Sequence, residues 1–171
     1  MKKTITTIAM LGMLLPGMAQ EVKTTFQTSS AWKPTIDVRA DAVMVYGTGS
    51  SPQISFQERI DSWRKQGYTT HFMTGIAWGG YSDYFTGKWD GKQHMDEGQK
   101  DMKGDTIVHN PGTPYIVPTL NYLKYFKETQ IKPVIDAGIR EIFLEEPEFW
   151  AFAGYSESFK REWQDYYGFP W

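Results

Sequence analysis

The sequence predicts an α/β fold of parallel βα repeats that corresponds to the first part of a (β/α)8 barrel. Three short apolar runs alternate along the chain with segments whose apolar residues have helical spacing. Such alternation is typical of parallel strands joined by right-handed crossover helices. A doubly wound sheet usually has about five strands, and a complete barrel typically has about 250 residues. Because the chain supplies fewer units than either, we expect a truncated barrel.

The first unit is a strand followed by a helix. Residues 42–46 form a continuous apolar run, as expected for a strand buried on both faces. Ser55 and Glu58 have the spacing of a capping box, in which both side chains satisfy free backbone N–H groups at a helix start. Gly67 provides the end of this helix. Its apolar residues recur at helical spacing, namely Phe56, Ile60 and Trp63.

The second unit carries a long insertion between its strand and its helix. Residues 69–74 restart as a strand, and residues 75–118 are rich in glycine, aspartate and aromatic residues. The helix begins at Thr119 and ends at Gly138, and Pro133 inside it predicts a kink or a restart. The insertion opens at the carboxyl ends of the strands, where α/β folds place their chemistry.

The third unit holds the most informative segment of the chain. Residues 142–144 form an apolar strand that leads into three carboxylates, Glu145, Glu146 and Glu148. Carboxylates repel one another and are costly to desolvate, so three of them at the end of a core strand indicate an active site. The alternative is that they form ion pairs or cap the next helix. That last helix begins after Ser156, which caps it, and ends at Gly168.

Strand parity separates the three acids. Ile142, Leu144 and Glu146 share one face, and the apolar pair leading into Glu146 predicts that Glu146 lies at the mouth of the barrel interior. A partly desolvated carboxyl group there has its pKa raised toward neutrality, as a general acid requires. We expect Glu148 to support Glu146 in catalysis, and Glu145 to face the helix layer or a neighbouring loop.

The run Ile142 to Trp150, with an aromatic helix behind it, resembles the secreted (β/α)8-barrel glycoside hydrolases. In the large clan of this family with two catalytic glutamates, one glutamate at the end of the fourth strand is the acid/base, and a second on a later strand is the nucleophile. The resemblance implies that Glu146 is the acid/base residue. The clan has Asn-Glu where this chain has Glu145-Glu146, and the corresponding strand here is the third by sequence count.

Aromatic residues are abundant, with 7 Trp, 10 Tyr and 10 Phe. Several alternate with glycine and aspartate in the insertion, where they either pack onto the scaffold or meet a ligand. Aromatic faces stack on pyranose rings, and aspartate accepts hydrogen bonds from sugar hydroxyls. We therefore expect an oligo- or polysaccharide to be bound by Trp78, Asp83 and Trp89, together with Glu145 and Trp150 of the acidic segment.

The N-terminus predicts export. Residues 1–19 combine two lysines, a short apolar stretch and a small-x-small cleavage pattern, as in a signal peptide; a membrane anchor is the alternative. We expect residues 20–40 to be an extended segment and residues 41–171 to be the glycosidase-like domain. The protein would then be secreted or periplasmic, without membrane association after cleavage. The 16 basic and 20 acidic residues that remain argue against a nucleic-acid partner.

The sequence predicts neither a cofactor nor a metal site. Gly47-Thr48-Gly49 lacks the final glycine of a dinucleotide-binding loop, and the histidines have no ligand spacing. Glycoside hydrolysis needs two carboxyl groups about 5–10 Å apart, whereas Glu146 and Glu148 lie on one segment. We therefore expect the second carboxylate to be missing from this chain, which alone is then inactive. The alternatives are a non-catalytic glycan-binding protein or inactive remnant, and a metal-dependent sugar isomerase-like barrel.

Overall fold

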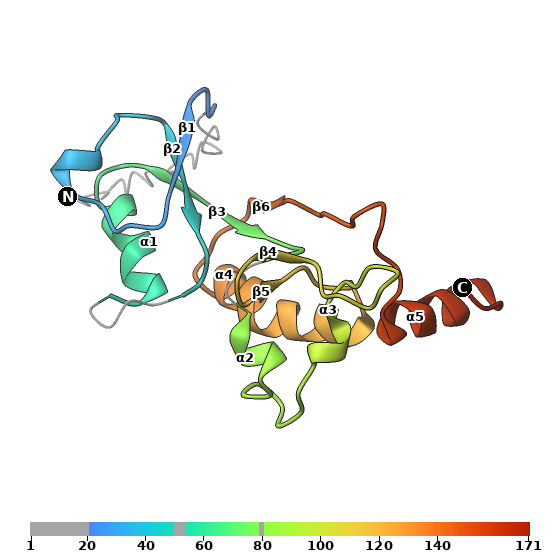
Figure 1. Cartoon of the computed structure of the whole chain (residues 1–171). Helices are drawn as coiled ribbons and strands as arrows, with labels where there is room; N and C mark the ends of the chain where they lie inside the picture. The colour runs from blue at the N-terminus through green and yellow to red at the C-terminus, as the bar shows by residue number, and fades with distance from the viewer. Residues whose placement is uncertain (1–20, 50–53, 79–80) are drawn as a thin grey trace, which may run out of the picture.

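The computed structural model describes residues 21–49, 54–78 and 81–171, so the predicted signal peptide lies outside the described residues. Four strands form one parallel sheet in the order β1-β2-β3-β6 (Figure 1). Helices interleave with these strands, which confirms the predicted α/β fold with parallel strands. Within the described residues the sheet ends at β1 and β6 and does not close into a barrel. The strands are β1 (Thr25–Thr28), β2 (Ala42–Tyr46), β3 (Thr69–Gly75) and β6 (Ile142–Glu145).

The sequence did not predict β1, which lies in the segment 20–40 that we expected to be merely extended. β1 pairs in parallel with β2, and Phe26 lies opposite Val43. Phe26 also packs edge-on against Trp63, with ring centroids 5.3 Å apart. The strand escapes a pattern search because it has only 4 residues, none of them fully buried. The sheet therefore begins before residue 41, the boundary that the sequence suggested.

α1 (Phe56–Arg64) and α5 (Glu157–Tyr167) begin where the sequence predicts, and α5 ends at the predicted glycine, whereas α1 ends at Arg64, three residues before Gly67. In α1, Ser55 Oγ accepts from the Glu58 N–H at 3.2 Å, and the Glu58 carboxylate accepts from the Ser55 N–H at 2.8 Å. α5 ends at Gly168, whose φ of 76° is the left-handed conformation that glycine adopts freely. The other helical segments outside the insertion are η1 (Pro34–Ile36), α3 (Leu120–Phe126), the π-helical η3 (Lys127–Ile131) and α4 (Lys132–Asp136).

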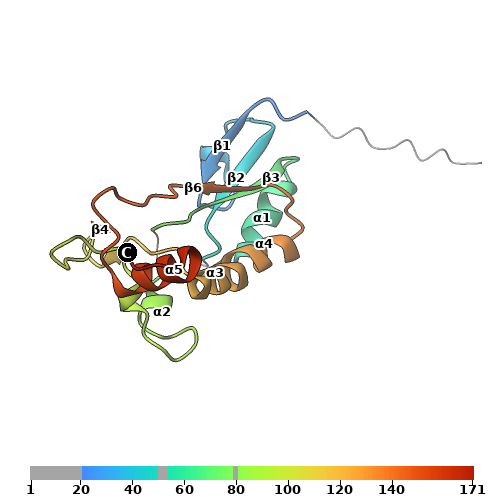
Figure 2. The same ribbon diagram turned by 90° about the vertical axis from the view of Figure 1, so that its right-hand side faces the viewer.

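α1 and α4 cover the same face of the sheet (Figure 2). Val43 and Val45 of β2 and Phe72 of β3 meet apolar side chains of both helices in one core. Burial of this apolar surface is the main force that holds helices and sheet together. The helices and the turn after α4 contribute Phe56, Ile60, Trp63, Val134, Ala137 and Ile139.

The π-helical segment η3 joins α3 to α4 and accommodates Pro133. Proline lacks an N–H, so Pro133 cannot donate to the carbonyl of Thr129 four residues earlier. That carbonyl instead lies 3.2 Å from Thr48 Oγ1, whose single hydrogen it shares with Gln130 Oε1 at 2.9 Å. The predicted interruption is therefore present, as a π-helical turn followed by a restart at Lys132. The loop after β2 thus compensates for the missing helical hydrogen bond.

The insertion after β3 builds a second core with α3. It contains α2 (Ser82–Phe85), η2 (Met95–Glu97) and a hairpin of β4 (Val108–Asn110) and β5 (Thr113–Pro114). The second core is mainly aromatic and comprises Tyr81, Tyr84, Phe85, Ile116, Tyr122, Tyr125 and Phe126.

α5 packs against η2 of the insertion and lies beyond the end of the sheet (Figure 1). The Arg161 guanidinium pairs with the Asp96 carboxylate at 3.2 Å, and Ser158 Oγ donates to the Asp96 carbonyl at 2.9 Å. The third βα unit therefore differs from the first, whose helix covers the sheet. In the described part of the chain, no helix is both long and apolar enough to cross a membrane.

Replacing Thr48 by valine should lower the free energy of unfolding by about 1 kcal/mol, because the Thr129 carbonyl and Gln130 Oε1 lose the hydrogen-bond donor that they share. In a Pro133→Ala background the helix regains an N–H near this carbonyl, so the same change should have a smaller effect. Urea denaturation of the single and double variants measures both losses. Equal losses in the two backgrounds would show that Thr48 does not compensate for Pro133.

Candidate functional site

The carboxyl ends of β2, β3 and β6 meet beside the acidic segment. Glu145 of β6 lies opposite Gly75 of β3. The Tyr46 hydroxyl, at the end of β2, accepts a hydrogen bond from the Gly75 N–H at 3.3 Å and lies close enough to the Glu145 carboxylate to interact with it. Burial and this carboxylate raise the pKa of Tyr46 to about 12, so the hydroxyl stays protonated at neutral pH. The sheet thus brings Tyr46 of β2 and Glu145 of β6 together at the end of β3, which lies between their strands.

In the structure, the two faces of β6 point in directions opposite to those that the sequence predicted. Ile142 packs into the core with α1 and α4, so Leu144 also points to the helix layer. Phe143 stacks on His71 of β3 on the opposite face, with ring centroids 5.7 Å apart. Glu145 shares that face, so of the two predicted directions the helix layer is wrong, and the neighbouring-loop alternative is not contradicted. The alternation of residues was no guide here, because β6 carries apolar side chains on both faces. The sequence therefore does not indicate which face of β6 meets the helices.

Glu146 has a strained backbone conformation directly after the strand. Its φ is 50°, in the left-handed region that residues other than glycine rarely adopt. The residue before a proline normally prefers an extended conformation, so Glu146, which precedes Pro147, departs from that preference too. Because the chain turns here, strand parity does not set the direction of the Glu146 side chain. Strain of about 1–2 kcal/mol of this kind is typical of functional sites.

The pKa of Glu146 is raised above its ordinary value. Loss of solvent around the carboxyl group is the largest cause, and repulsion from Glu145 and Glu148 adds to it, while His109 acts in the opposite direction. The direction agrees with the expectation from the sequence, although the residue is exposed rather than enclosed. A raised pKa favours the protonated form, which a proton donor needs.

Glu148 lies among side chains of the insertion. Its Oε2 atom is buried and has no hydrogen-bond partner in the described part of the chain. The Tyr115 hydroxyl lies beside this carboxylate, and burial together with Glu148 raises the pKa of Tyr115. Tyr115 also contacts His109 Nδ1 at 3.2 Å, and His109 stacks on Trp78 with ring centroids 4.0 Å apart. Glu148, Tyr115, His109 and Trp78 therefore form a continuous row.

The fully buried Gln99 attaches the acidic segment to the insertion. Its Nε2 donates to the carbonyls of Ile116 at 3.0 Å and Glu148 at 2.8 Å, and its Oε1 accepts from the Trp150 N–H at 3.2 Å. Both amide hydrogens and the amide oxygen are thus used, which satisfies the polar group and defines its orientation. Gln99 therefore sets the position of residues 148–150 relative to the insertion.

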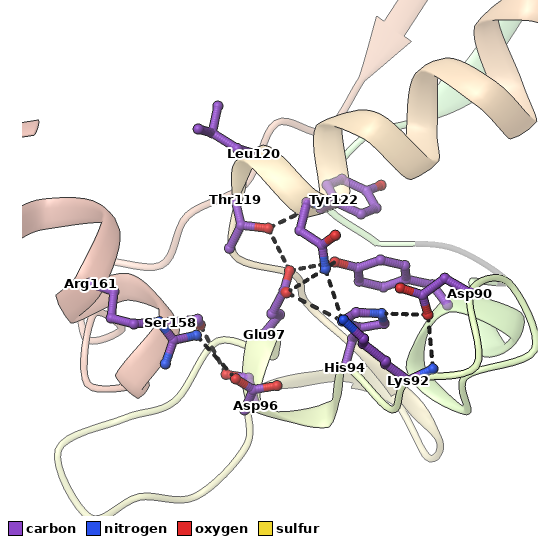
Figure 3. A network of polar contacts seen from close by, with 12 residues as sticks. Asp90, Lys92, His94, Asp96, Glu97, Thr119, Leu120, Tyr122, Ser158 and Arg161 are labelled. Atoms are coloured by element: carbon purple, nitrogen blue, oxygen red, sulfur yellow. Dashed lines mark hydrogen bonds and ion pairs between the residues drawn. The ribbon is translucent and has the colours of Figure 1, made fainter. Parts of the chain in front are cut away.

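A network of polar contacts in turn holds the insertion against α3 (Figure 3). The buried Glu97 carboxylate accepts hydrogen bonds from the Tyr84 hydroxyl at 2.5 Å, the Thr119 hydroxyl at 2.5 Å and Asn121 Nδ2 at 3.0 Å. Thr119 Oγ1 also accepts from the Tyr122 N–H and thereby caps α3. Three donors compensate for burial of this carboxylate. Glu97 therefore has a structural role in this network and is not available as a free acid.

A cavity of about 540 Å³ lies beside Tyr46. Its walls include Trp78 and Asp83, two residues that the sequence predicted to bind sugar. The Tyr125 hydroxyl donates to Asp83 Oδ1 at 2.6 Å and orients that carboxylate. Gly75 allows the close approach of Trp78, because a Cβ atom on Gly75 would lie 2.7 Å from the Trp78 carbonyl oxygen. The cavity thus combines an aromatic wall with polar groups.

The other two predicted sugar-binding tryptophans lie outside this cavity. Trp89 packs against Tyr84 and the second core, and its Nε1 donates to Glu128 at 3.1 Å. Trp150 packs edge-on against Tyr115, with ring centroids 5.6 Å apart, and is 38% exposed. Trp150 therefore borders the row that contains Glu148, whereas Trp89 belongs to the scaffold of the insertion.

The sequence analysis missed three residues of the site, Tyr46, His109 and Tyr115. Tyr46 ends a predicted strand, and a polar aromatic residue at that position was an available signal. His109 and Tyr115 lie in the non-periodic insertion, so only the fold brings them to the acids. Among the described residues no group of three His, Cys, Asp or Glu side chains could hold a metal ion, so the isomerase-like alternative has no candidate ligand set there.

Comparison of the chain with protein-family models, curated proteins and solved structures found no match. The chemistry of the site must therefore be argued from its own geometry.

Replacing Glu146 by glutamine should stabilise the protein at pH 7. Because the folded-state pKa is raised, the contribution of this carboxyl group is favourable below the pKa of the unfolded chain and is lost as pH rises through the folded value. The stabilisation by the variant should therefore shrink as pH falls. Thermal unfolding midpoints measured from about pH 3 to 8 follow the expected change.

Glu157→Gln is the matched control with the opposite sign. A hydrogen bond from Lys160 lowers the pKa of Glu157, so its contribution is present above the unfolded pKa and is lost as pH falls through the folded value. This variant should be less stable than the wild type at pH 7 and equal to it at low pH. If both variants shift the midpoint in the same direction at pH 7, the pKa of Glu146 is not raised by loss of solvent and its neighbouring acids.

Proposed function

We propose that the chain is a carbohydrate-active protein of the glycoside hydrolase type. One observation carries the proposal: at the end of a parallel strand, three carboxylates lie close together, and one of them, Glu146, has a strained backbone and a carboxyl group with a raised pKa. A protonated carboxyl group can donate its proton to a glycosidic oxygen. The nearby cavity with Trp78 and Asp83 offers a stacking face and a hydrogen-bond acceptor for a sugar ring.

The strand count supports this proposal. With β1 included, β6 is the fourth strand of the parallel sheet along the chain. The clan that the acidic segment resembles carries its acid/base glutamate on the fourth strand, so one difference from that clan disappears. The other difference, Glu145 in place of asparagine, remains. In our proposal Glu145 and Tyr46 together contact sugar hydroxyls beside Glu146.

We also propose that the sheet is the opening part of a (β/α)8 barrel. Phe143 and Leu144, on opposite faces of the edge strand β6, are 41% and 48% exposed, and Leu120 of α3 is 74% exposed. Further βα units would cover this edge and these apolar side chains. Such units would also supply the second carboxylate, since Glu145, Glu146 and Glu148 all belong to one segment. The predicted signal peptide is consistent with an exported protein that acts on extracellular glycans.

Glu146→Gln in the longest natural form should lower turnover of aryl glycosides by about 100-fold or more, because glutamine cannot donate the proton. In the wild type, activity should decrease as pH rises through the pKa of Glu146, since the protonated form is the active one. Circular dichroism checks that the variant is folded, and Glu157→Gln should retain activity. Full turnover by Glu146→Gln would remove this residue from the mechanism.

A non-catalytic glycan-binding protein is the second candidate, and the position of all three acids on one segment favours it for this chain alone. The 171-residue chain should then bind oligosaccharides without hydrolysing them. Trp78→Ala should weaken binding by about two- to tenfold through loss of stacking, measured by calorimetry. Trp171→Ala, which removes a half-exposed tryptophan that packs on Phe159 and Trp163 of α5, should bind as the wild type does. Equal affinities of the two variants would dismiss Trp78 as a sugar platform.

A further inference from the structure

A second cavity, of about 680 Å³, opens at the carboxyl ends of β1 and β2. Arg59 of α1 lines it, and the exposed Lys33 lies at its rim. None of its described lining residues is an aspartate or a glutamate. The cavity therefore has a basic lining, in contrast to the acidic segment at the end of β6.

Arg59 is a buried residue that is only 6% exposed. Its guanidinium gathers four backbone carbonyls from the loops after β1 and β2, donating from Nη1 to Ser29 at 2.8 Å and Tyr46 at 3.2 Å. From Nη2 it donates to Gly47 at 2.7 Å and Gly49 at 2.6 Å. The Nε–H is buried and has no hydrogen-bond partner in the described part of the chain. One of its five N–H donors thus has no partner among the described residues.

The charge of Arg59 is not neutralised by any described carboxylate. Among the described residues, no aspartate or glutamate forms an ion pair with Arg59. Burial lowers the pKa of its guanidinium, and no acidic group acts in the opposite direction. A guanidinium stays charged at neutral pH even so. Carbonyl dipoles solvate a buried cation without cancelling its charge, so the cavity has a positive potential to which Lys33 adds.

This cavity adjoins the one that Trp78 and Asp83 line. Tyr46, Gly47 and Gly49 line both of them. A ligand beside Tyr46 in the Trp78 cavity can therefore extend toward Arg59. The two ends differ in charge, because Asp83 lines the Trp78 cavity and Glu145 lies beside Tyr46, whereas Arg59 and Lys33 line the other cavity. An anionic group on the ligand would be repelled by the acids and attracted by Arg59 and Lys33.

We propose that the ligand is an acidic oligosaccharide, whose carboxylate- or sulfate-bearing sugar occupies the cavity of Arg59 and Lys33 while a neighbouring sugar lies beside Trp78. This inference rests on the proposed function and specifies its substrate class. Arg59 then has two tasks, since it holds the strand ends together and provides the positive charge for the acidic group. A guanidinium N–H and an ammonium group are the donors that bind carboxylate and sulfate oxygens most strongly.

The signal for this site was present in the sequence. Arg59 lies three positions after Phe56 and four before Trp63, on the apolar face of the predicted helix. A charged residue on that face has to be buried with partners or bind a ligand.

Calorimetry on the 171-residue chain tests the proposal with neutral, uronate-containing and sulfated oligosaccharides of equal length. At least one acidic series should bind about tenfold more tightly than the neutral one, and its advantage should decrease between about 50 and 300 mM salt. The series that binds identifies the anion as carboxylate or sulfate. Equal affinities for neutral and acidic sugars would overturn the inference and leave the proposed function standing. Failure to bind any sugar would overturn both.

Lys33→Glu is the first variant, because Lys33 is exposed and its replacement leaves the core intact. It should weaken binding of the acidic ligand about tenfold and leave neutral-sugar binding unchanged. Lys88→Glu, an exposed lysine of the insertion, is the matched control for the change in net charge and should have no effect. Arg59→Lys retains the charge but loses the forked bonds, so it should be less stable and still prefer acidic ligands. Identical binding by Lys33→Glu and Lys88→Glu would refute the site.

Discussion

The hydrogen bonds of Gln99 are the constraint on which the candidate site depends. A fully buried amide cannot be left unpaired without a large loss of stability, so the insertion and the acidic segment have to meet at this side chain. Residue 99 comes 49 positions before Glu148, and no local preference joins them. Through the same contact the row of Trp78, His109 and Tyr115 acquires its position beside the carboxylates. The fold of the insertion is therefore part of the site.

The carboxyl edge of the sheet is electrically divided. At β6, three carboxylates crowd together and the pKa of Glu146 rises. At β1 and β2, Arg59 gathers four carbonyls without a counter-charge in the described part of the chain. Tyr46 lies between the two regions. Its hydroxyl lies beside the Glu145 carboxylate, and its carbonyl accepts a hydrogen bond from Arg59. Opposite charges kept apart by a neutral hydrogen-bonding residue provide the asymmetry that orients a charged ligand.

The elements that local chemistry defines were predictable. The capping box at Ser55 and the stop at Gly168 involve contacts within a few residues, and they agree with the sequence analysis. β1 was missed because a four-residue edge strand leaves almost no periodic signal. Trp89 was expected at a ligand because a loop offers aromatics no visible core, yet the insertion builds a core of its own. The barrel and its missing carboxylate remain predictions.

The sequence by itself determined that strands and helices alternate, and that three carboxylates follow an apolar strand, because these properties depend on residue order and short-range hydrogen bonds. Only the tertiary structure decided which acid contacts which neighbour. Glu145 lies on the face of Tyr46 because the two residues, almost a hundred positions apart, are brought together across β3. Glu146 is set apart by a left-handed turn that no strand pattern predicts. Such contacts depend on packing over long separations, which the order of residues does not express.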